Sequence, residues 1–264
     1  MPDTANYVDK KAYFSKVLTV YGRKPALEAL RDDHLQCHAL HLAVNNRESG
    51  ITNQLREQAA RRGIPVREHS RAELARISKN GKQDQGVAVD IVCPAFTTIE
   101  NYLPTLQQAQ PRRLLALDGI TNPQNLGMII RSATAGQIDG IIWSRRGNAA
   151  LGPLVIKASA GTLYRAPLVI CTELPQTLRE CRASGAAICT LAADAPRSLF
   201  EYQPQGHCVY VLGNETEGVS AGARELADKA LSIPMANGVE SLNVAVTASL
   251  IAYAGLFTGH HLVR

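Results

Sequence analysis

Three short polar stretches, each placed where an apolar run ends or a helix-like run begins, constrain the fold of this chain more than any other feature. They are 125–131 (NLGMIIR), 212–218 (LGNETEG), and the linked pair 233–235 (IPM) and 241–244 (SLNV). In open α/β folds, ligands bind at the edge where strands end and helices begin. Three such positions, far apart in the sequence, therefore predict one composite pocket at one edge of a sheet.

The second half of the chain, from Arg112 onward, alternates short apolar runs with helix-like stretches. Apolar runs that are bounded by turns and alternate with helices are typical of a mostly parallel sheet covered on both faces. This pattern predicts an α/β fold for residues 112–264. We expect strands at 114–117, 140–143, 166–170, 187–192, 207–212 and 230–233, and helices at 125–137, 153–163, 174–184, 221–227 and 241–257.

A smaller α/β unit is expected at residues 17–93, with strands at 17–21, 39–44 and 86–92. One helix runs to Leu30 with Pro25 in its first turn, where proline is tolerated. A second helix, at 54–62, ends at a Gly-Ile-Pro stop signal. The polar residues 1–16 are interpreted as a flexible extension. Three prolines suggest a linker at 94–111, although 98–108 could form a short helix.

Composition narrows the class of protein. Hydrophobic residues make up 45% of the chain, but no apolar run reaches the roughly 18 residues of a membrane span. The polar N-terminus lacks the apolar segment of a signal peptide, so we expect a cytoplasmic protein. Residues 1–93 hold 15 Lys+Arg against 11 Asp+Glu, and residues 94–264 hold 13 against 12. This basic bias is compatible with a nucleic-acid partner.

Six cysteines are scattered along the chain without a Cys-x-x-Cys pair, and no histidines stand at zinc-ligand spacing. No metal site is therefore expected. Most of the cysteines stand in apolar runs, which predicts buried, reduced thiols. They are Cys37, Cys93, Cys171, Cys181, Cys189 and Cys208.

The first polar stretch follows an Asn122-Pro123 turn signal. Asn125 suits a helix N-cap, and Gly127 permits close approach of backbone or ligand. Arg131, one turn further, can donate two parallel hydrogen bonds to a phosphate. The alternative is a capped surface helix whose arginine makes an ordinary ion pair.

In the second stretch, Gly213 and Gly218 flank Glu215 and Glu217 directly after the apolar run 207–212. Glycines at a strand end can offer backbone groups to a ligand, and Glu215 can hold backbone amides or the guanidinium of Arg131. The absence of G-x-G-x-x-G argues against a dinucleotide-binding oxidoreductase. The alternative is a plain turn with solvated acids.

In the third stretch, a strand that ends near Ile233 is joined to the last helix, for which Ser241 suits the N-cap. Asn243 is then expected in the first turn. The following run, 244–255, is apolar and rich in small residues. Such a helix packs closely inside a core or against a partner.

Together and in this order, the three stretches resemble the signature motifs of the SpoU/TrmH family of RNA ribose 2′-O-methyltransferases, part of the SPOUT superfamily. The resemblance covers most of 114–257. It extends to 21–30 (YGRKPALEAL) and 85–87 (QGV), which resemble an L30e-type RNA-binding domain. Thr216 stands where the family often has a small residue or glycine, and we expect it to alter loop shape more than chemistry.

The resemblance implies a parallel α/β sheet with a deep trefoil knot, a homodimer, and S-adenosylmethionine bound in the knot. It implies catalytic roles for Arg131, Asn125, Glu215, Ser241 and Asn243. The implied cofactor contacts are Leu212, Gly213, Asn214, Gly218, Ile233, Met235, Leu242 and Val244.

The expected reaction is in-line methyl transfer to a ribose 2′-hydroxyl of a structured RNA. We expect ribosomal RNA, with transfer RNA as the alternative. Because arginine stays charged, Arg131 is expected to clamp a phosphate and stabilise developing alkoxide charge, with a general-base role as the rival. A non-catalytic RNA-binding protein is the remaining alternative. The expected phosphate contacts are Arg23, Lys24, Arg61, Arg62, Arg67, Lys79 and Lys82.

Overall fold

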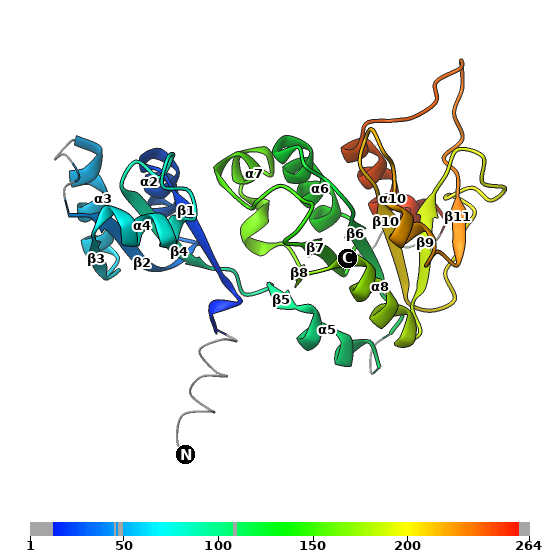
Figure 1. Ribbon diagram of the computed structural model, residues 1–264, viewed down its shortest axis with the longest axis horizontal. Helices are drawn as coiled ribbons and strands as arrows, with labels where there is room; N and C mark the ends of the chain where they lie inside the picture. Colours follow the sequence, from blue (N-terminus) through cyan, green and yellow to red (C-terminus); the bar gives the residue numbers. More distant parts are fainter. Residues whose placement is uncertain (1–12, 45, 47–49, 108–109, 259–264) are drawn as a thin grey trace. The chain divides into compact units, whose positions relative to one another are not determined.

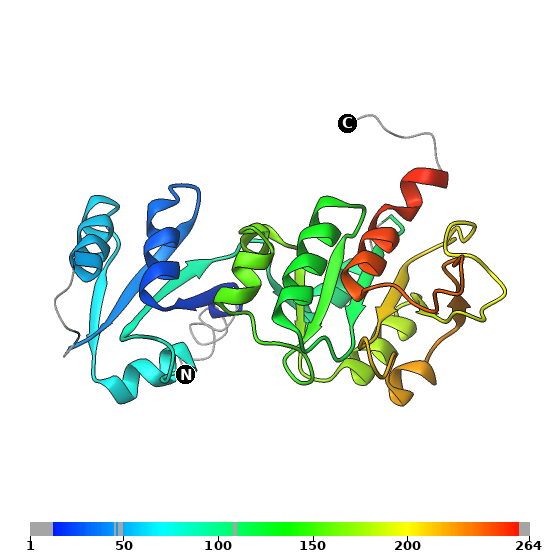
Figure 2. The ribbon, with the colours of Figure 1, turned by 90° about the horizontal axis from the view of Figure 1, so that it is seen from above.

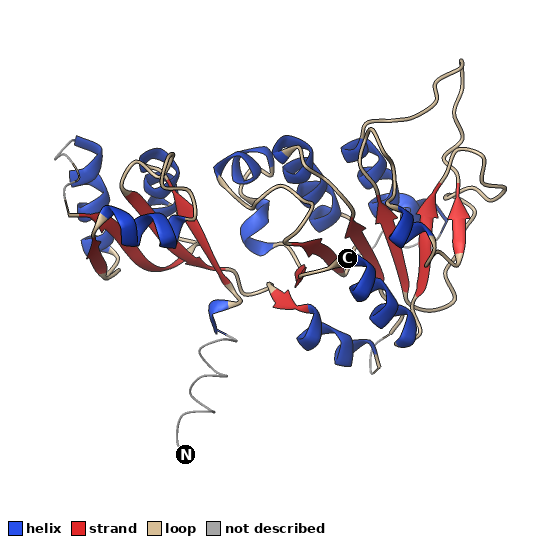
Figure 3. Cartoon of the chain, in the orientation of Figure 1, coloured by secondary structure: helices blue, strands red, loops and turns tan. Residues whose placement is uncertain are grey.

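The computed structural model describes residues 13–44, 46, 50–107 and 110–258. The chain divides into two compact units, the first formed by residues 1–94 with 151–153, and the second by 95–150 with 154–264. The expected flexible extension, 1–16, lies largely outside the described residues. Figure 1 labels the helices and strands, and Figure 3 colours them by type.

The first unit has a four-stranded sheet within the described residues, in the order β1-β4-β2-β3. Strand β4 runs antiparallel to β1 and β2, whereas β3 runs parallel to β2. Helices α2 and α3 lie on one face, and α4 covers the other (Figure 2). The elements are β1 (Val17–Tyr21), α2 (Arg23–Arg31), β2 (Gln36–Ala43), α3 (Gly50–Arg61), β3 (Val66–His69), α4 (Arg71–Ser78) and β4 (Val87–Val92).

Two elements of this unit, β3 and α4, were not predicted. Strand β3 is short and mostly exposed, so it shows no apolar alternation. Helix α4 did carry a sequence signal, because Ser70 and Glu73 form a capping box, in which each side chain meets the backbone of the other residue.

The second unit has a seven-stranded sheet within the described residues, in the order β11-β9-β10-β6-β7-β8-β5, and every pairing is parallel. This confirms the predicted α/β class; the trefoil knot stays a prediction. The elements are β5 (Thr97–Thr98), α5 (Ile99–Leu106), β6 (Arg113–Leu117), α6 (Pro123–Ala135), β7 (Gly140–Ser144), α7 (Pro153–Ala158), η1 (Thr162–Arg165), β8 (Leu168–Cys171), α8 (Leu174–Ala183), β9 (Ala187–Leu191), β10 (Cys208–Leu212), α9 (Ala221–Arg224), β11 (Lys229–Leu231) and α10 (Val244–Thr258).

Helices cover both faces of this sheet (Figure 2). Apolar residues of α5, α8 and α9 bury one face in a shared core with Leu114, Ile142 and Val211. Helices α6 and α10 pack against each other on the opposite face. The segment expected as a linker therefore has structure of its own, because β5 pairs with β8 and α5 enters the core.

Two predicted helices are shorter than expected. The predicted helix at 153–163 divides into α7 and η1, because Ala160 and Gly161 between them adopt positive φ angles of 49° and 76°. The predicted helix at 221–227 ends at Arg224.

Five of the six cysteines are buried and Cys37 is half-buried, and none forms a disulfide. The prediction of buried, reduced thiols is therefore confirmed for most of them. Burial raises the pKa of Cys93 and of Cys181 to about 12, so both stay protonated at neutral pH.

Candidate active site

The register of the second sheet brings the first two polar stretches to one edge. Strands β6 and β10 are neighbours, with Leu117 opposite Leu212 at their carboxyl ends. Just beyond, the Asp118 N–H donates to the Leu212 carbonyl at 2.9 Å. The Ser220 N–H donates to Asp118 Oδ2 at 2.7 Å, which ties the end of the second loop to the first strand.

Asn125 joins all three stretches. Its side chain is buried, with 8% of the residue exposed. Its Nδ2 donates to Glu215 Oε1, and its Oδ1 accepts a hydrogen bond from Asn243 Nδ2 at 3.3 Å. One amide therefore uses both its donor and its acceptor to link α6, the loop after β10 and the start of α10.

The two predicted N-caps are corrected by three and by two residues. Asn122, not Asn125, caps α6, because its Oδ1 accepts from the N–H groups of Gln124 and Asn125. Pro123 at the first helical position starts the helix earlier than expected. The side chain of Asn125 is thereby free to reach the other two stretches.

Asn243, not Ser241, caps α10. Its Oδ1 accepts from the Ala245 N–H at 2.8 Å, and its carbonyl accepts from the Thr247 N–H at 3.0 Å. Ser241 is exposed and precedes the helix. Asn243 thus caps the helix with its side-chain oxygen and bonds to Asn125 with its side-chain nitrogen.

The loop after β10 is closed on itself. Asn214 and Gly218 exchange two backbone hydrogen bonds of 2.9 Å each. Asn214 Oδ1 also accepts from the Thr216 N–H at 2.8 Å, and Asn214 Nδ2 donates to the Gly119 carbonyl at 2.8 Å. A side chain at Gly213 would overlap the backbone of Gly218. The N–H and the carbonyl of Gly218 are therefore both used within the loop.

Gly127 permits the approach of protein and not of a ligand. A Cβ at this position would lie 2.5 Å from Ala158 Cβ and 2.7 Å from the Val155 carbonyl oxygen. Helix α7 therefore packs against α6 at the one residue of the motif that lacks a side chain.

Arg131 is exposed on α6, and its side chain makes no hydrogen bond or ion pair with any other residue that the structure describes. The expected Arg131–Glu215 contact is absent from this part of the chain, because Glu215 accepts from Asn125 instead. A guanidinium without a carboxylate partner keeps its full charge and all its donors for a bound group.

The remaining cofactor candidates stand around this junction. Leu212 and Val244 are buried, Ile233 and Leu242 are half-buried, and Met235 is exposed. Ile233 and Met235 belong to the segment 232–243, which connects β11 to α10. Val239 in the same segment is 51% exposed, an unusual position for a large apolar side chain.

Helix α10 packs against α6 inside the second unit, as one of the two expectations for its small residues had it. Ser249 Oγ donates to Ser132 Oγ at 2.8 Å, and the Gln137 N–H donates to the Ala252 carbonyl at 2.8 Å. A Cβ at Gly136 would lie 2.7 Å from Ala252 Cβ. Small residues on both helices thus let α6 and α10 approach closely.

The cations predicted to contact RNA fall into two groups on the first unit. Residues of the first group stand near the loop between α4 and β4, where Arg23 Nη2 donates to Asn46 Oδ1 at 2.7 Å and the Arg23 N–H donates to Gln85 Oε1 at 3.1 Å. Lys24, Lys79 and Lys82 are exposed there. Arg67, on β3, is also exposed.

In the second group, Arg61 pairs with Asp33 at 3.2 Å. Arg62 is corrected, because its guanidinium donates to the carbonyls of Leu30 and Asp32 at 3.0 Å each and to that of Leu35. The Leu30 carbonyl lies in the last turn of α2, where carbonyls lack an intrahelical donor. The carbonyls of Asp32 and Leu35 also accept from the N–H groups of Leu35 and Cys37, at 3.1 Å each. Arg62 is therefore a helix-capping residue and leaves the set of expected phosphate contacts.

Residues that organise the site but were not predicted include Asn148. Its Oδ1 accepts from the Ile120 N–H at 2.7 Å, and its Nδ2 donates to the Leu117 carbonyl at 3.0 Å. It fixes the loop that leads into α6. A lone asparagine beyond the next strand carries no local signal of this role.

In the part of the chain that the structure describes, no group of three or more His, Cys, Asp or Glu side chains is placed to hold a metal ion. None of its helices combines the length and the apolar character needed to cross a membrane.

Family comparisons cover most of the chain. Residues 112–253 match the model of the SpoU rRNA Methylase family, and residues 19–94 match the model described as RNA 2′-O ribose methyltransferase substrate binding. A Mycolicibacterium smegmatis protein, named an uncharacterized tRNA/rRNA methyltransferase, is 35% identical over 233 residues, 88% of this chain and 74% of that protein. A Mycobacterium avium protein of the same name is 32% identical over 233 residues, 88% of this chain and 75% of that one.

Solved structures share the fold. The SpoU methyltransferase AviRb from Streptomyces viridochromogenes, in complex with AdoMet, aligns with a TM-score of 0.61 and 24% identity over 92% of this chain and 91% of its own. The AdoMet-bound rRNA methyltransferase from Sinorhizobium meliloti aligns with a TM-score of 0.58 and 18% identity over 99% and 92%.

Proposed function

Because this chain belongs to the SpoU rRNA methylase family and is an RNA methyltransferase, we propose that it methylates a ribose 2′-hydroxyl of a structured RNA, with S-adenosylmethionine as the methyl donor. The observation that carries this proposal is the junction at Asn125, which links the three polar stretches. The first of these stretches also carries Arg131, whose side chain has no partner among the described residues. We expect ribosomal RNA as the substrate and keep transfer RNA as the alternative.

The residues present fit S-adenosylmethionine. The segments 212–218 and 233–244 carry Glu215, Glu217 and Glu240 and no Lys or Arg, a charge distribution that suits a cationic sulfonium. Half-buried and exposed apolar side chains at Ile233, Met235 and Leu242 suit the flat face of an adenine. These residues, with Leu212, Gly213, Asn214, Gly218 and Val244, would hold the cofactor, which when bound supplies an activated methyl group.

Arg131 has a positioning and electrostatic role in this proposal. Its guanidinium would clamp an RNA phosphate with two parallel hydrogen bonds and so orient the 2′-hydroxyl. The same charge lowers the cost of negative charge developing on the 2′-oxygen as its proton departs. Asn125, Glu215 and Asn243 keep the surrounding loops in register, and Ser241, exposed beside them, is the polar side chain free to meet a ligand.

The name of the family that residues 112–253 match, SpoU rRNA Methylase, supports ribosomal RNA as the substrate. The first unit supports an RNA substrate in general, because its residues match a substrate-binding family. Arg23, Lys24, Lys79 and Lys82 would contact phosphates around the loop between α4 and β4, with Arg61 and Arg67 as outlying contacts. Sequence-selective RNA binding usually targets loops and bulges, so we expect an exposed target nucleotide.

We also propose the homodimer that the resemblance implies. Met128 on α6 and Val246 on α10 are 41% and 48% exposed. Exposed large apolar side chains on neighbouring helices are typical of a surface that another protein covers. The cytoplasmic location stays a prediction.

Methyl transfer from labelled S-adenosylmethionine to unmodified ribosomal and transfer RNAs tests the proposal, with the RNA digested to nucleosides afterwards. We expect a labelled 2′-O-methylnucleoside with the wild type, and a decrease of roughly 100-fold or more with Arg131→Ala. Arg179→Ala is the matched control, because Arg179 is an exposed arginine of α8 that contacts only the neutral Gln176. Near-normal turnover of Arg131→Lys would contradict the bidentate clamp.

A separate measurement of S-adenosylmethionine binding distinguishes two reasons for an absence of labelled RNA: a missing substrate and a non-catalytic protein. If the wild type binds S-adenosylmethionine but labels neither RNA, the substrate is another RNA or an assembly intermediate of the ribosome. If it binds no cofactor, the chain is a non-catalytic RNA-binding member of the family.

A further inference from the structure

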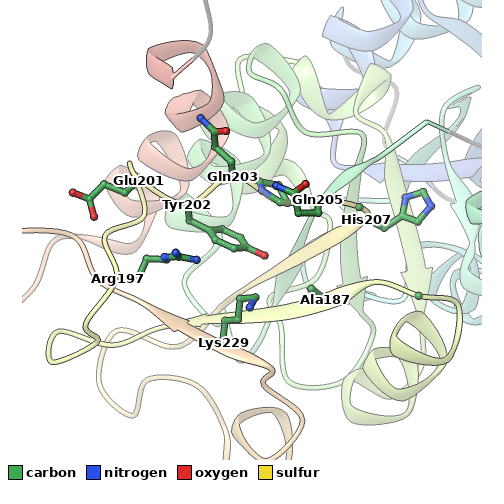
Figure 4. A pocket seen from close by; sticks show the side chains of 11 residues that line it. Ala187, Arg197, Glu201, Tyr202, Gln203, Gln205, His207 and Lys229 are labelled. Atoms are coloured by element: carbon green, nitrogen blue, oxygen red, sulfur yellow. The ribbon is translucent and has the colours of Figure 1, made fainter.

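One cavity of the second unit lies away from the candidate active site. It has a volume of about 480 Å³ and is lined by residues of the segment 197–207 together with Gly185, Ala187 and Lys229 (Figure 4). Gly185, Ala187 and His207 stand at the amino ends of β9 and β10, whereas the polar stretches stand at the carboxyl ends. None of the residues that line the cavity is a candidate active-site residue. Arg197 lies nearest to the third polar stretch, because its carbonyl accepts a hydrogen bond from the N–H of Ser232, which precedes Ile233, at 2.8 Å.

The cavity exists because one crossover of the sheet lacks a helix. Among the described residues, the connections from β6 to β7, β7 to β8, β8 to β9 and β10 to β11 each contain one. The connection from β9 to β10, residues 192–207, contains none. Leu199 and Tyr202 are its buried residues. Loops of about this length without secondary structure are uncommon in compact domains and often functional.

Two cations face this cavity without a carboxylate partner among the described residues. The side chains of Arg197 and Lys229 point toward Tyr202 from different elements (Figure 4). Lys229 Nζ lies 6.0 Å from the centre of the Tyr202 ring, a cation–π distance. Burial raises the pKa of the Tyr202 hydroxyl, so the ring remains neutral and does not offset these charges.

The acidic residues nearby do not neutralise the charges of Arg197 and Lys229. Glu201 lines the cavity, but its side chain points away from Arg197 and Lys229 (Figure 4). Asp228 precedes Lys229, but its Oδ1 pairs with Arg182 at 2.7 Å and its Oδ2 accepts from the Ile188 N–H at 2.9 Å. The cavity therefore presents two positive charges to whatever enters it.

We propose that this cavity binds a phosphate ester, with Arg197 and Lys229 as the phosphate ligands. Guanidinium and ammonium groups are the side chains that proteins use for phosphate. The volume exceeds that of a phosphate and accommodates the attached nucleoside. Gln203, Gln205 and His207 line the rest of the cavity, and the Arg112 N–H donates to His207 Nδ1, which leaves Nε2 as a donor. The phosphate comes either from the RNA backbone or from a free nucleotide.

Binding of adenosine monophosphate and of a short RNA, each followed by calorimetry at several salt concentrations, tests the proposal without requiring methyl transfer. We expect Arg197→Gln and Lys229→Gln each to weaken at least one of the two ligands by roughly tenfold. If RNA is the source, each substitution also lowers the slope of log K against log[salt] by about 0.7–0.9. Charge-conserving Arg197→Lys and Lys229→Arg should retain most of the binding.

Arg179→Gln is the matched control, because it removes one charge from an exposed residue outside the cavity. Weakened binding of RNA alone assigns the site to the RNA backbone, and weakened binding of the mononucleotide alone assigns it to a free nucleotide. Loss of both shows that either source is accepted. The proposal is overturned if Arg197→Gln and Lys229→Gln weaken the binding of neither ligand more than Arg179→Gln does. It is also overturned if these two variants are thermally stable and bind both ligands as the wild type does. Because no step of this test uses methyl transfer, its failure is distinguishable from failure of the proposed function.

Discussion

Asn243 Nδ2 lies 3.3 Å from Asn125 Oδ1, although the two residues are 118 positions apart in the sequence. The same Asn125 amide reaches Glu215 through its Nδ2. The first residue of one predicted motif is thus the physical link between the other two. This explains how the loops of three distant segments keep one arrangement relative to each other at the carboxyl edge of the sheet.

This link predicts energetic coupling between Asn125 and Glu215. Asn125→Ala should lower methyl transfer by roughly 10–100-fold, since the loops lose their common partner. It should lower the free energy of unfolding by about 1–2 kcal/mol, because a buried amide is removed. Glu215→Ala in the Asn125→Ala background should add little to either loss. A double-mutant cycle measures the coupling, and two fully additive effects would show that the hydrogen bond does not matter.

Arg62 and Lys82, both basic and both in the first unit, should respond in opposite ways. Lys82→Gln should reduce the salt slope of RNA binding by about 0.7–0.9 and leave stability unchanged. Arg62→Gln should lower the free energy of unfolding by about 1–3 kcal/mol, because the Leu30 and Asp32 carbonyls at the end of α2 each lose the guanidinium as a donor. Urea unfolding and RNA titration of both variants check this. If Arg62→Gln changed the salt slope of RNA binding and left the free energy of unfolding unchanged, Arg62 would be an RNA contact after all.

The lowered pKa of Asp90 in the folded protein predicts a loss of stability in acid. Burial opposes ionisation of its carboxyl, but hydrogen bonds from His41 and Thr19 outweigh burial and lower the pKa of Asp90. Because the folded pKa is below the unfolded value of about 3.9, the stabilisation is present above that pH and is lost as pH falls through the folded pKa. The lowered pKa of His69, caused by burial and then by His41, also disfavours protonation of the folded state.

Asp90→Asn tests this dependence. It should destabilise the protein by about 2 kcal/mol at pH 7, and the difference from the wild type should shrink below about pH 4 as Asp90 becomes protonated. Asp33→Asn is the control, since Asp33 forms an exposed pair with Arg61 at 3.2 Å, of a kind worth under about 1 kcal/mol. Urea midpoints across the pH range provide the measurement. A difference that stays constant down to pH 2 would refute the assignment.

The thiols should react in two classes. Cys37 is the only one of the six cysteines that is not buried. Burial raises the pKa of Cys93 and Cys181 to about 12, so their thiolate fraction at pH 8 is on the order of 10⁻⁴. A polar disulfide reagent should label one thiol quickly in the native protein and the rest only on unfolding, and Cys37→Ser should abolish the fast phase. Several fast thiols in the native state would contradict the burial.

Six of the seven strands that the structure describes in the second sheet, and most of its helices, were predictable to within a few residues, because they depend on local apolar patterns and turns. The exception is the two-residue β5, which falls in the segment expected as a linker. The cap of α4 was also present in the sequence, at Ser70 and Glu73, but the short exposed β3 before it was not recognised. The caps of α6 and α10 were misplaced because several Asn and Ser residues stand near each helix start. Only the backbone geometry decides which of them is the cap.

The sequence by itself determined the fold class, the three polar stretches and the family, since these are carried by local patterns and their order. Tertiary structure alone decided what the polar side chains do. Asn125 and Glu215 are 90 residues apart, and Arg62 meets the end of a helix 30 residues before it. The cavity near Arg197 and Lys229 arises from a crossover without a helix. Hydrogen bonds between distant segments depend on how the strands are ordered and paired, and no local pattern encodes that order.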